Sequence, residues 1–183
     1  SVEDIEKRVR EAKKIVPELM AMQKKKSDKP NVLYFEGLEG VRQAYEYKLA
    51  DFAGKEIVGF FARTNEVDKD LHKEVYIPWN DAKMENDISV RGFTVDDPKL
   101  GDYTKYFGAK KGMIHAKFLP ESLYSADCSF EIFDWGTRIV IMRSKQAIIV
   151  ESTEFALAMK QVFELLWEKT KGEYDRPVEL KLK

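Results

Sequence analysis

From Asn31 onward, short apolar runs alternate with longer amphipathic stretches, and this alternation restricts the fold more than any other feature. It is typical of α/β domains, in which the runs form strands and the amphipathic stretches form helices packed on the sheet. The predicted strands are residues 32–35, 57–61, 88–95, 112–119, 128–133, 138–142 and 147–150. The predicted helices are residues 38–52, 68–87 on both sides of Pro78, 98–106 and 153–171.

The last strands are joined by connections short enough for hairpins, Asp134–Thr137 and Ser144–Gln146. Hairpins require antiparallel pairing, whereas strands separated by helices pair in parallel. We therefore expect an α/β fold with a mixed sheet flanked by helices. Ser152 and Gly172 are the predicted caps of the final helix.

Residues 1–26 are predicted to form a different kind of helix. Apolar residues recur there with alternating gaps of three and four, as in the seam of a coiled coil. Pro17 predicts a kink or a restart, and a charged segment follows the helix. We expect a dimerisation helix over residues 1–29 and an α/β domain over residues 30–183. The predicted seam residues are Val2, Ile5, Val9, Ala12, Val16 and Leu19.

Composition excludes several classes of protein. The 183 residues carry a formal net charge of -1, which argues against a surface built to neutralise nucleic-acid phosphates. The chain contains one cysteine, Cys128, and no apolar run long enough to cross a membrane. We therefore expect a cytoplasmic protein with a buried thiol and no membrane partner. Two histidines and one cysteine offer little material for zinc, and we predict neither metal nor cofactor.

His115-Ala116-Lys117 is the strongest chemical motif. Alternation along a strand places His115 and Lys117 on one face, as in phospholipase-D-type phosphodiesterases, which pair a nucleophilic histidine with a phosphate-binding lysine. Their motif continues with an aspartate, but Ser122 occupies that position here. Because a nucleophilic imidazole needs an orienting group, we predict no catalytic residues and a non-enzymatic role.

The second motif is the glycine-containing turn around Glu36 and Glu39, where a strand leads into a helix. The turn lacks the lysine of a nucleotide-binding loop, and its simplest interpretation is structural. The carboxyl ends of parallel strands are nevertheless where open α/β sheets bind ligands. If the strands ending at residues 35, 61 and 95 lie side by side, one opening collects a set of polar residues suited to a small polar effector. That set is Glu36, Glu39, Arg63, Asp96, His115 and Lys117.

Several segments together resemble one family, the effector-sensing C-terminal domain of TrmB-type transcriptional regulators. The resemblance covers roughly residues 15–171. The segments that carry it are Tyr34–Val41, Ile88–Thr94, Phe118–Pro120, Arg138–Val150 and Met159–Glu168.

This resemblance implies a phospholipase-D-like fold that has lost catalysis, a homodimer, and DNA binding only through a winged helix upstream of this chain. The leading hypothesis is thus a ligand-sensing and dimerisation domain of a transcriptional regulator. A ligand that prefers one dimer geometry would change the spacing of the attached DNA-binding domains. Two alternatives stay open: a dimeric phosphodiesterase that uses His115 and Lys117, and a scaffold domain that binds nothing.

Overall fold

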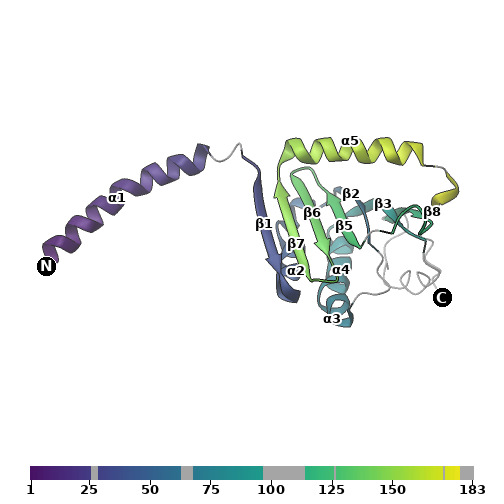
Figure 1. The fold of residues 1–183 in the computed structure, drawn as a ribbon, viewed down its shortest axis with the longest axis horizontal. Helices are drawn as coiled ribbons and strands as arrows, with labels where there is room; N and C mark the ends of the chain where they lie inside the picture. Colours follow the sequence, from purple (N-terminus) through teal and green to yellow (C-terminus); the bar gives the residue numbers. More distant parts are fainter. Residues whose placement is uncertain (26–28, 63–67, 97–113, 126, 171, 178–183) are drawn as a thin grey trace. The chain divides into compact units, whose positions relative to one another are not determined.

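The computed structural model describes residues 1–25, 29–62, 68–96, 114–125, 127–170 and 172–177 (Figure 1). The chain divides into two compact units, Ser1–Asn31 and Val32–Lys183. The first unit contains helix α1 (Val2–Lys25). The second is an α/β domain with a mixed sheet flanked by helices, which confirms the predicted fold class.

Helix α1 continues through Pro17, so the predicted restart is wrong. A proline inside a helix removes one backbone hydrogen bond and strains one turn. The surrounding Lys, Glu, Ala and Leu residues are good helix formers, and they favour continuation of the helix on both sides.

The α/β unit follows the predicted alternation closely. In chain order its elements are β1 (Asn31–Glu36), α2 (Gly37–Glu46), the 3-10 helix η2 (Leu49–Phe52), β2 (Glu56–Phe60), α3 (Lys69–Leu71), the π-helix η3 (His72–Tyr76), α4 (Ile77–Glu85), β3 (Ser89–Val95), β4 (Ile114–Leu119), β5 (Cys128–Ile132), β6 (Gly136–Ile141), β7 (Gln146–Glu151), α5 (Thr153–Lys169), the 3-10 helix η5 (Gly172–Tyr174) and β8 (Asp175–Pro177). The helix predicted over residues 98–106 lies outside the described residues.

The sheet has the strand order β1-β7-β6-β5-β2-β3-β4-β8. Strands β2, β3 and β4 are parallel, with Val58 opposite Arg91 and Arg91 opposite His115. Strands β5, β6 and β7 form the two predicted antiparallel hairpins, and β5 joins them to β2. The order places β1 at one edge of the sheet, although β1 precedes β2 in the sequence.

Three local predictions need correction. The helix predicted over residues 38–52 ends at Glu46, because Lys48 adopts a left-handed conformation with φ 51° that an α-helix cannot contain. The final helix is capped at Thr170 instead of Gly172; the Thr170 N–H donates to the carbonyl of Leu166. Strand β8 was not predicted, because its three residues carry no periodic signal and pair with β4 only in the folded domain.

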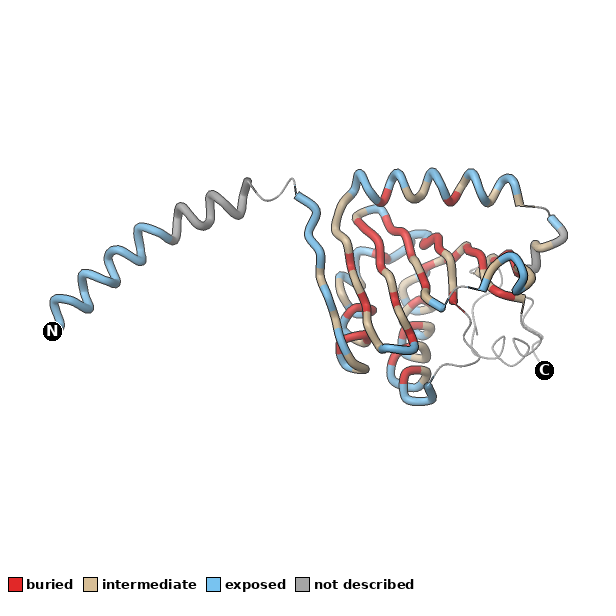
Figure 2. The backbone as a smooth tube through the Cα atoms, in the orientation of Figure 1, coloured by how far each residue is buried: buried red, intermediate tan, exposed pale blue. Residues whose placement is uncertain are grey.

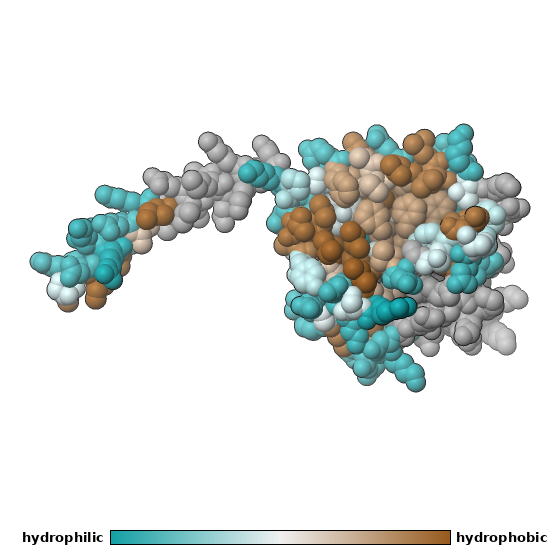
Figure 3. Space-filling view, in the orientation of Figure 1, coloured by the Kyte–Doolittle hydropathy of each residue, from teal (hydrophilic) through white to brown (hydrophobic). Residues whose placement is uncertain are grey.

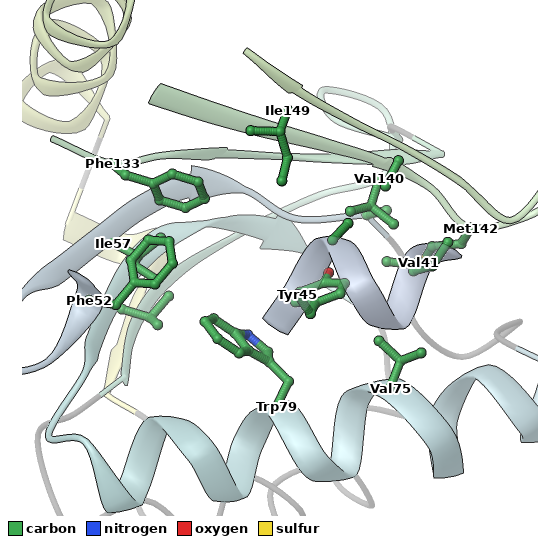
Figure 4. Close-up of a cluster of buried hydrophobic side chains, with 14 of the residues drawn as sticks. Val41, Tyr45, Phe52, Ile57, Val75, Trp79, Phe133, Val140, Met142 and Ile149 are labelled. Atoms are coloured by element: carbon green, nitrogen blue, oxygen red, sulfur yellow. The ribbon is translucent and has the colours of Figure 1, made fainter. Parts of the chain in front are cut away.

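The two faces of the sheet are covered by different helices (Figure 2). Helices α2 and α4 and the π-helix η3 bury the larger core, in which Trp79 contacts Phe52 and Tyr45 (Figure 4). Trp79 is therefore part of this core. Helix α5 covers part of the other face, where Phe163 is fully buried beside Phe93. Burying a side chain of this size stabilises the folded domain by about 1.5–3 kcal/mol relative to leaving it exposed.

Candidate functional site

The His115–Lys117 pair lies on β4 and faces the C-terminal end of α5, as the alternation of strand side chains predicted. Lys117 is only 5% exposed. Its Nζ donates hydrogen bonds to the carbonyl oxygens of Trp167 at 2.6 Å and Thr170 at 3.2 Å. The ammonium also lies 4.4 Å from the Trp167 ring centroid. The last carbonyls of a helix lack partners within the helix and carry partial negative charge, so Lys117 serves as a C-terminal cap of α5.

His115 packs against the same tryptophan. Its ring centroid lies 5.1 Å from that of Trp167, with the two planes perpendicular at 89°. Ser122, which occupies the position of the aspartate in the phosphodiesterase motif, is exposed in the turn after β4. The geometry therefore gives the pair a structural role at the junction of β4 and α5, and it supplies no carboxylate at position 122 to orient the imidazole.

The turn between β1 and α2 holds the two predicted glutamates. Glu39 is exposed and accepts hydrogen bonds from Arg42 Nε at 2.9 Å and Arg42 Nη2 at 2.6 Å, which lower the pKa of its carboxyl group. Gly37 has φ 77°, a conformation that favours glycine, and its N–H donates to the carbonyl of Lys145. The turn is thus tied to the β6–β7 hairpin, and Glu36 remains exposed at its start.

The sequence analysis predicted that the effector-binding residues line one opening, and this prediction is wrong. Four strands separate β1 from β3 in the sheet, so Glu36 and Asp96 lie on the order of 24 Å apart at about 4.8 Å per strand. Asp96 follows the carboxyl end of β3, where its N–H donates to the carbonyl of Leu119. His115 lies near the start of β4, four residues before Leu119, which pairs with Val95 at the end of β3. At about 3.3 Å per residue His115 is roughly 13 Å from that end. Arg63 lies outside the described residues. The effector-binding role of each residue stays a prediction.

A buried charged cluster was missed by the sequence analysis. Arg138, on β6, has no exposed surface, and Glu131, its partner across the hairpin on β5, is 3% exposed. Arg138 Nε donates to Glu131 Oε2 at 2.6 Å, and Arg138 Nη1 donates to the carbonyl of Ala44 at 3.1 Å. The guanidinium carbon lies 4.0 Å from the Tyr45 ring centroid and 4.8 Å from that of Trp79. Aromatic rings therefore enclose the ion pair.

Lys83, on α4, adds a second cation to this cluster. It is 8% exposed, and burial lowers the pKa of its ammonium to about 8, although Glu131 partly offsets that effect. The cluster therefore contains two cations and one anion when Lys83 is protonated. Within the described part of the chain, Nη2 of Arg138 has no hydrogen-bond partner. The sequence did carry a signal: Glu131 and Arg138 are charged residues inside two apolar predicted strands, on either side of a predicted hairpin connection.

Arg91, on β3, connects helix α5 to the sheet face that this helix covers. Its Nη1 donates to Glu164 Oε2 at 2.8 Å, and its Nη2 donates to Glu56 Oε1 at 3.0 Å. Its guanidinium carbon lies 5.2 Å from the Trp167 ring centroid. The hydrogen bond to Glu164 raises the already high pKa of Arg91. This network fixes the position of α5 over β2 and β3.

Helix α1 exposes its predicted seam. Val2, Ile5 and Val9 are 72%, 64% and 47% exposed. Ala12 is also exposed, whereas the side chains of Val16 and Leu19 lie outside the described set. Cys128, predicted to be buried, is half-buried, because it lies on the sheet face that α5 only partly covers.

Among the residues that the structure places, no helix has the length and hydrophobicity needed to span a bilayer. The same residues contain no group of three or more His, Cys, Asp or Glu side chains arranged to hold a metal ion.

No protein-family model matches the sequence, and comparison with curated proteins finds no significant match. Among solved structures, the chain is similar to TrmBL2, described as an archaeal chromatin protein with a novel mode of DNA binding. The TM-score is 0.46 at 17% identity, over 92% of this chain and 65% of TrmBL2. It is also similar to NucT from Helicobacter pylori, with a TM-score of 0.47 at 12% identity, over 76% of this chain and 97% of NucT. The chain thus spans less than two thirds of the length of TrmBL2.

Proposed function

We propose that this chain is the ligand-sensing and dimerisation domain of a TrmB-type transcriptional regulator with a phospholipase-D-like fold, and that it performs no catalysis. The observation that carries the proposal is the apolar stripe of α1. Val2, Ile5 and Val9 are all about half exposed or more. Exposed apolar area is unfavourable by about 25 cal/mol per Å², and a stripe at this spacing becomes buried when two such helices pair.

The residue types of the stripe favour two parallel helices. Valine occupies positions 2, 9 and 16, one heptad apart. β-Branched residues at alternate seam positions, together with a leucine such as Leu19 between them, favour two-stranded coiled coils. A parallel pair would hold two copies in register and would place two attached DNA-binding domains at a defined spacing.

Disulfide trapping tests this pairing. In a Cys128→Ser background, Ile5→Cys places a thiol in the seam, where the two copies of residue 5 face each other. Mild oxidation should then link the chains. Lys7→Cys is the matched control, because residue 7 lies outside the seam and its two copies point apart. Equal or absent cross-linking of both variants would contradict the proposed pairing.

Effector binding is the second part of the proposal and is supported by the sequence resemblance. The predicted residues fall into separate places in the fold, so a small effector would contact one group only: Glu36 and Glu39 at the β1–α2 turn, Asp96 at the end of β3, or His115 and Lys117 under α5. A panel of small polar compounds should contain one that raises the melting temperature in proportion to its concentration. Glu36→Ala and His115→Ala would then show which group binds it. A panel without any stabilising compound would favour the scaffold alternative.

The phosphodiesterase alternative depends on His115 and Lys117 sharing a face. The Lys117 ammonium is already hydrogen-bonded to two helix carbonyls, and this use competes with phosphate binding. We therefore expect no hydrolysis of a model phosphodiester such as bis-p-nitrophenyl phosphate. Turnover that disappears in His115→Ala would replace the sensor proposal with an enzyme.

A further inference from the structure

The buried cluster around Arg138 contains more positive charge and more hydrogen-bond donors than its carboxylate can match. Its members Arg138, Glu131 and Lys83 are 0%, 3% and 8% exposed. The guanidinium has five N–H donors and the ammonium has three, whereas the carboxylate supplies one negative charge. With Lys83 protonated, the cluster therefore carries one positive charge in excess. An excess charge inside a protein is unfavourable unless it is paired.

Atom Nη2 of Arg138 is a buried donor that the protein itself does not satisfy. Nε of the same side chain donates to Glu131 Oε2 at 2.6 Å, and Nη1 donates to the carbonyl of Ala44 at 3.1 Å. Nη2 is also buried, and it has no hydrogen-bond partner among the residues that the structure describes. A guanidinium keeps its proton in proteins, so titration removes neither its charge nor its unmet N–H groups. The site therefore favours an acceptor that is negatively charged.

Aromatic rings from α2 and α4 surround the two cations. The guanidinium carbon of Arg138 lies 4.0 Å from the Tyr45 ring centroid and 4.8 Å from that of Trp79. The ammonium nitrogen of Lys83 lies 5.8 Å from the same Trp79 centroid. Figure 4 shows Trp79 projecting from α4 towards the sheet, beside Tyr45 of α2, whereas the largely apolar surface in Figure 3 belongs to the outside of the domain. An apolar wall with a few convergent charged groups is typical of small-ligand sites, and the exclusion of water strengthens electrostatic attraction there.

We propose that this cluster binds one small monovalent anion, with chloride as its simplest occupant, against Nη2 of Arg138. The anion accepts the hydrogen bond that Nη2 lacks, and its charge balances that of Lys83. A water molecule would accept the same hydrogen bond but would leave the positive charge unbalanced. A divalent anion would replace the excess positive charge by an excess negative one. The site does not rest on the proposed function, because it contains neither the α1 stripe nor any of the predicted effector-binding residues.

Urea unfolding of the full chain at pH 7 tests the site with chloride itself as the probe. Sodium gluconate is replaced stepwise by sodium chloride at a constant ionic strength of about 0.3 M, so that screening of surface charges stays the same. Chloride that binds only the folded chain should lower the unfolding equilibrium constant. Above the dissociation constant of the anion, each tenfold rise in chloride should lower the unfolding constant about tenfold. The chloride dependence should therefore be that of a single saturable site.

Three variants locate the effect. Lys83→Met removes the charge that the anion balances, so at least about tenfold more chloride should be needed for the same stabilisation, since close charge pairs in proteins are coupled by more than about 1.4 kcal/mol. The double variant Arg138→Met, Glu131→Gln removes Nη2 without leaving a buried charge unpaired, and its stability should not depend on chloride. Lys73→Met is the matched control, because the Lys73 side chain is 78% exposed, and it should respond as the original chain does.

Two results would overturn the proposal. Equal stability of the original chain in chloride and in gluconate would mean that Nη2 is satisfied by water alone. A chloride dependence that persists unchanged in Lys83→Met would mean that the anion binds elsewhere, as an adventitious ion only. If the double variant does not fold, the comparison of Lys83→Met with Lys73→Met still decides between these outcomes.

Discussion

Replacing Lys83 by methionine should stabilise the domain, although it removes a charge that lies beside Glu131. Burial lowers the pKa of Lys83 from an ordinary value of 10.5 to about 8. Folding therefore disfavours the charged form, by about 1.36 kcal/mol per pKa unit. Since Lys83 is only 8% exposed, little solvent screening reduces this penalty. Methionine keeps a flexible stem of similar length against Trp79 without the charge.

The sign of the pH dependence follows from the same pKa. Between pH 8 and 10.5 the unfolded chain keeps the Lys83 proton while the folded chain loses it, so stability rises with pH across this window. Below pH 8 both states are protonated and the full penalty applies. From the two pKa values of about 8 and 10.5, the penalty is about 3 kcal/mol at pH 7 and falls below about 1 kcal/mol at pH 10.

Urea unfolding of both proteins at pH 7, 8, 9 and 10 measures this effect. The stability advantage of Lys83→Met should be largest at pH 7 and should shrink towards pH 10. Lys73→Met is the matched control, because the Lys73 side chain is 78% exposed and its removal should leave the pH profile unchanged. A Lys83→Met protein that is no more stable at pH 7, or whose advantage does not depend on pH, would refute the reasoning.

Two further substitutions test the assigned contacts. Glu131→Ala leaves the buried cations Arg138 and Lys83 without their anion, so the free energy of unfolding should fall by about 3–5 kcal/mol; a loss under 1 kcal/mol in urea titration would mean that water reaches the cluster. Lys117→Met removes two charge-assisted hydrogen bonds to α5 and should destabilise the domain by about 2–4 kcal/mol. Amide exchange should also accelerate in the last turn of α5; exchange that matches the exposed control Lys169→Met would contradict the capping role.

Much of the local structure could be predicted because it depends on short-range periodicity. The apolar run at residues 57–61 and the hairpin between residues 128 and 142 appeared where alternation and turn residues placed them. The Ser152 cap of α5 was also predicted, and its Oγ accepts a hydrogen bond from the N–H of Phe155 at 3.2 Å. These features require only neighbouring residues.

The sequence by itself determined the α/β class, most strands, both hairpins and the common face of His115 and Lys117. The tertiary structure decided which strands became neighbours and what each polar side chain contacts. Strand β1 could pair at either edge of the sheet by its own pattern, and its place beside β7 moved Glu36 far from Asp96. The use of Lys117 as a cap for α5 required a helix that begins 36 residues later in the chain. Strand order and long-range capping depend on packing between distant segments, whose energies no local pattern encodes.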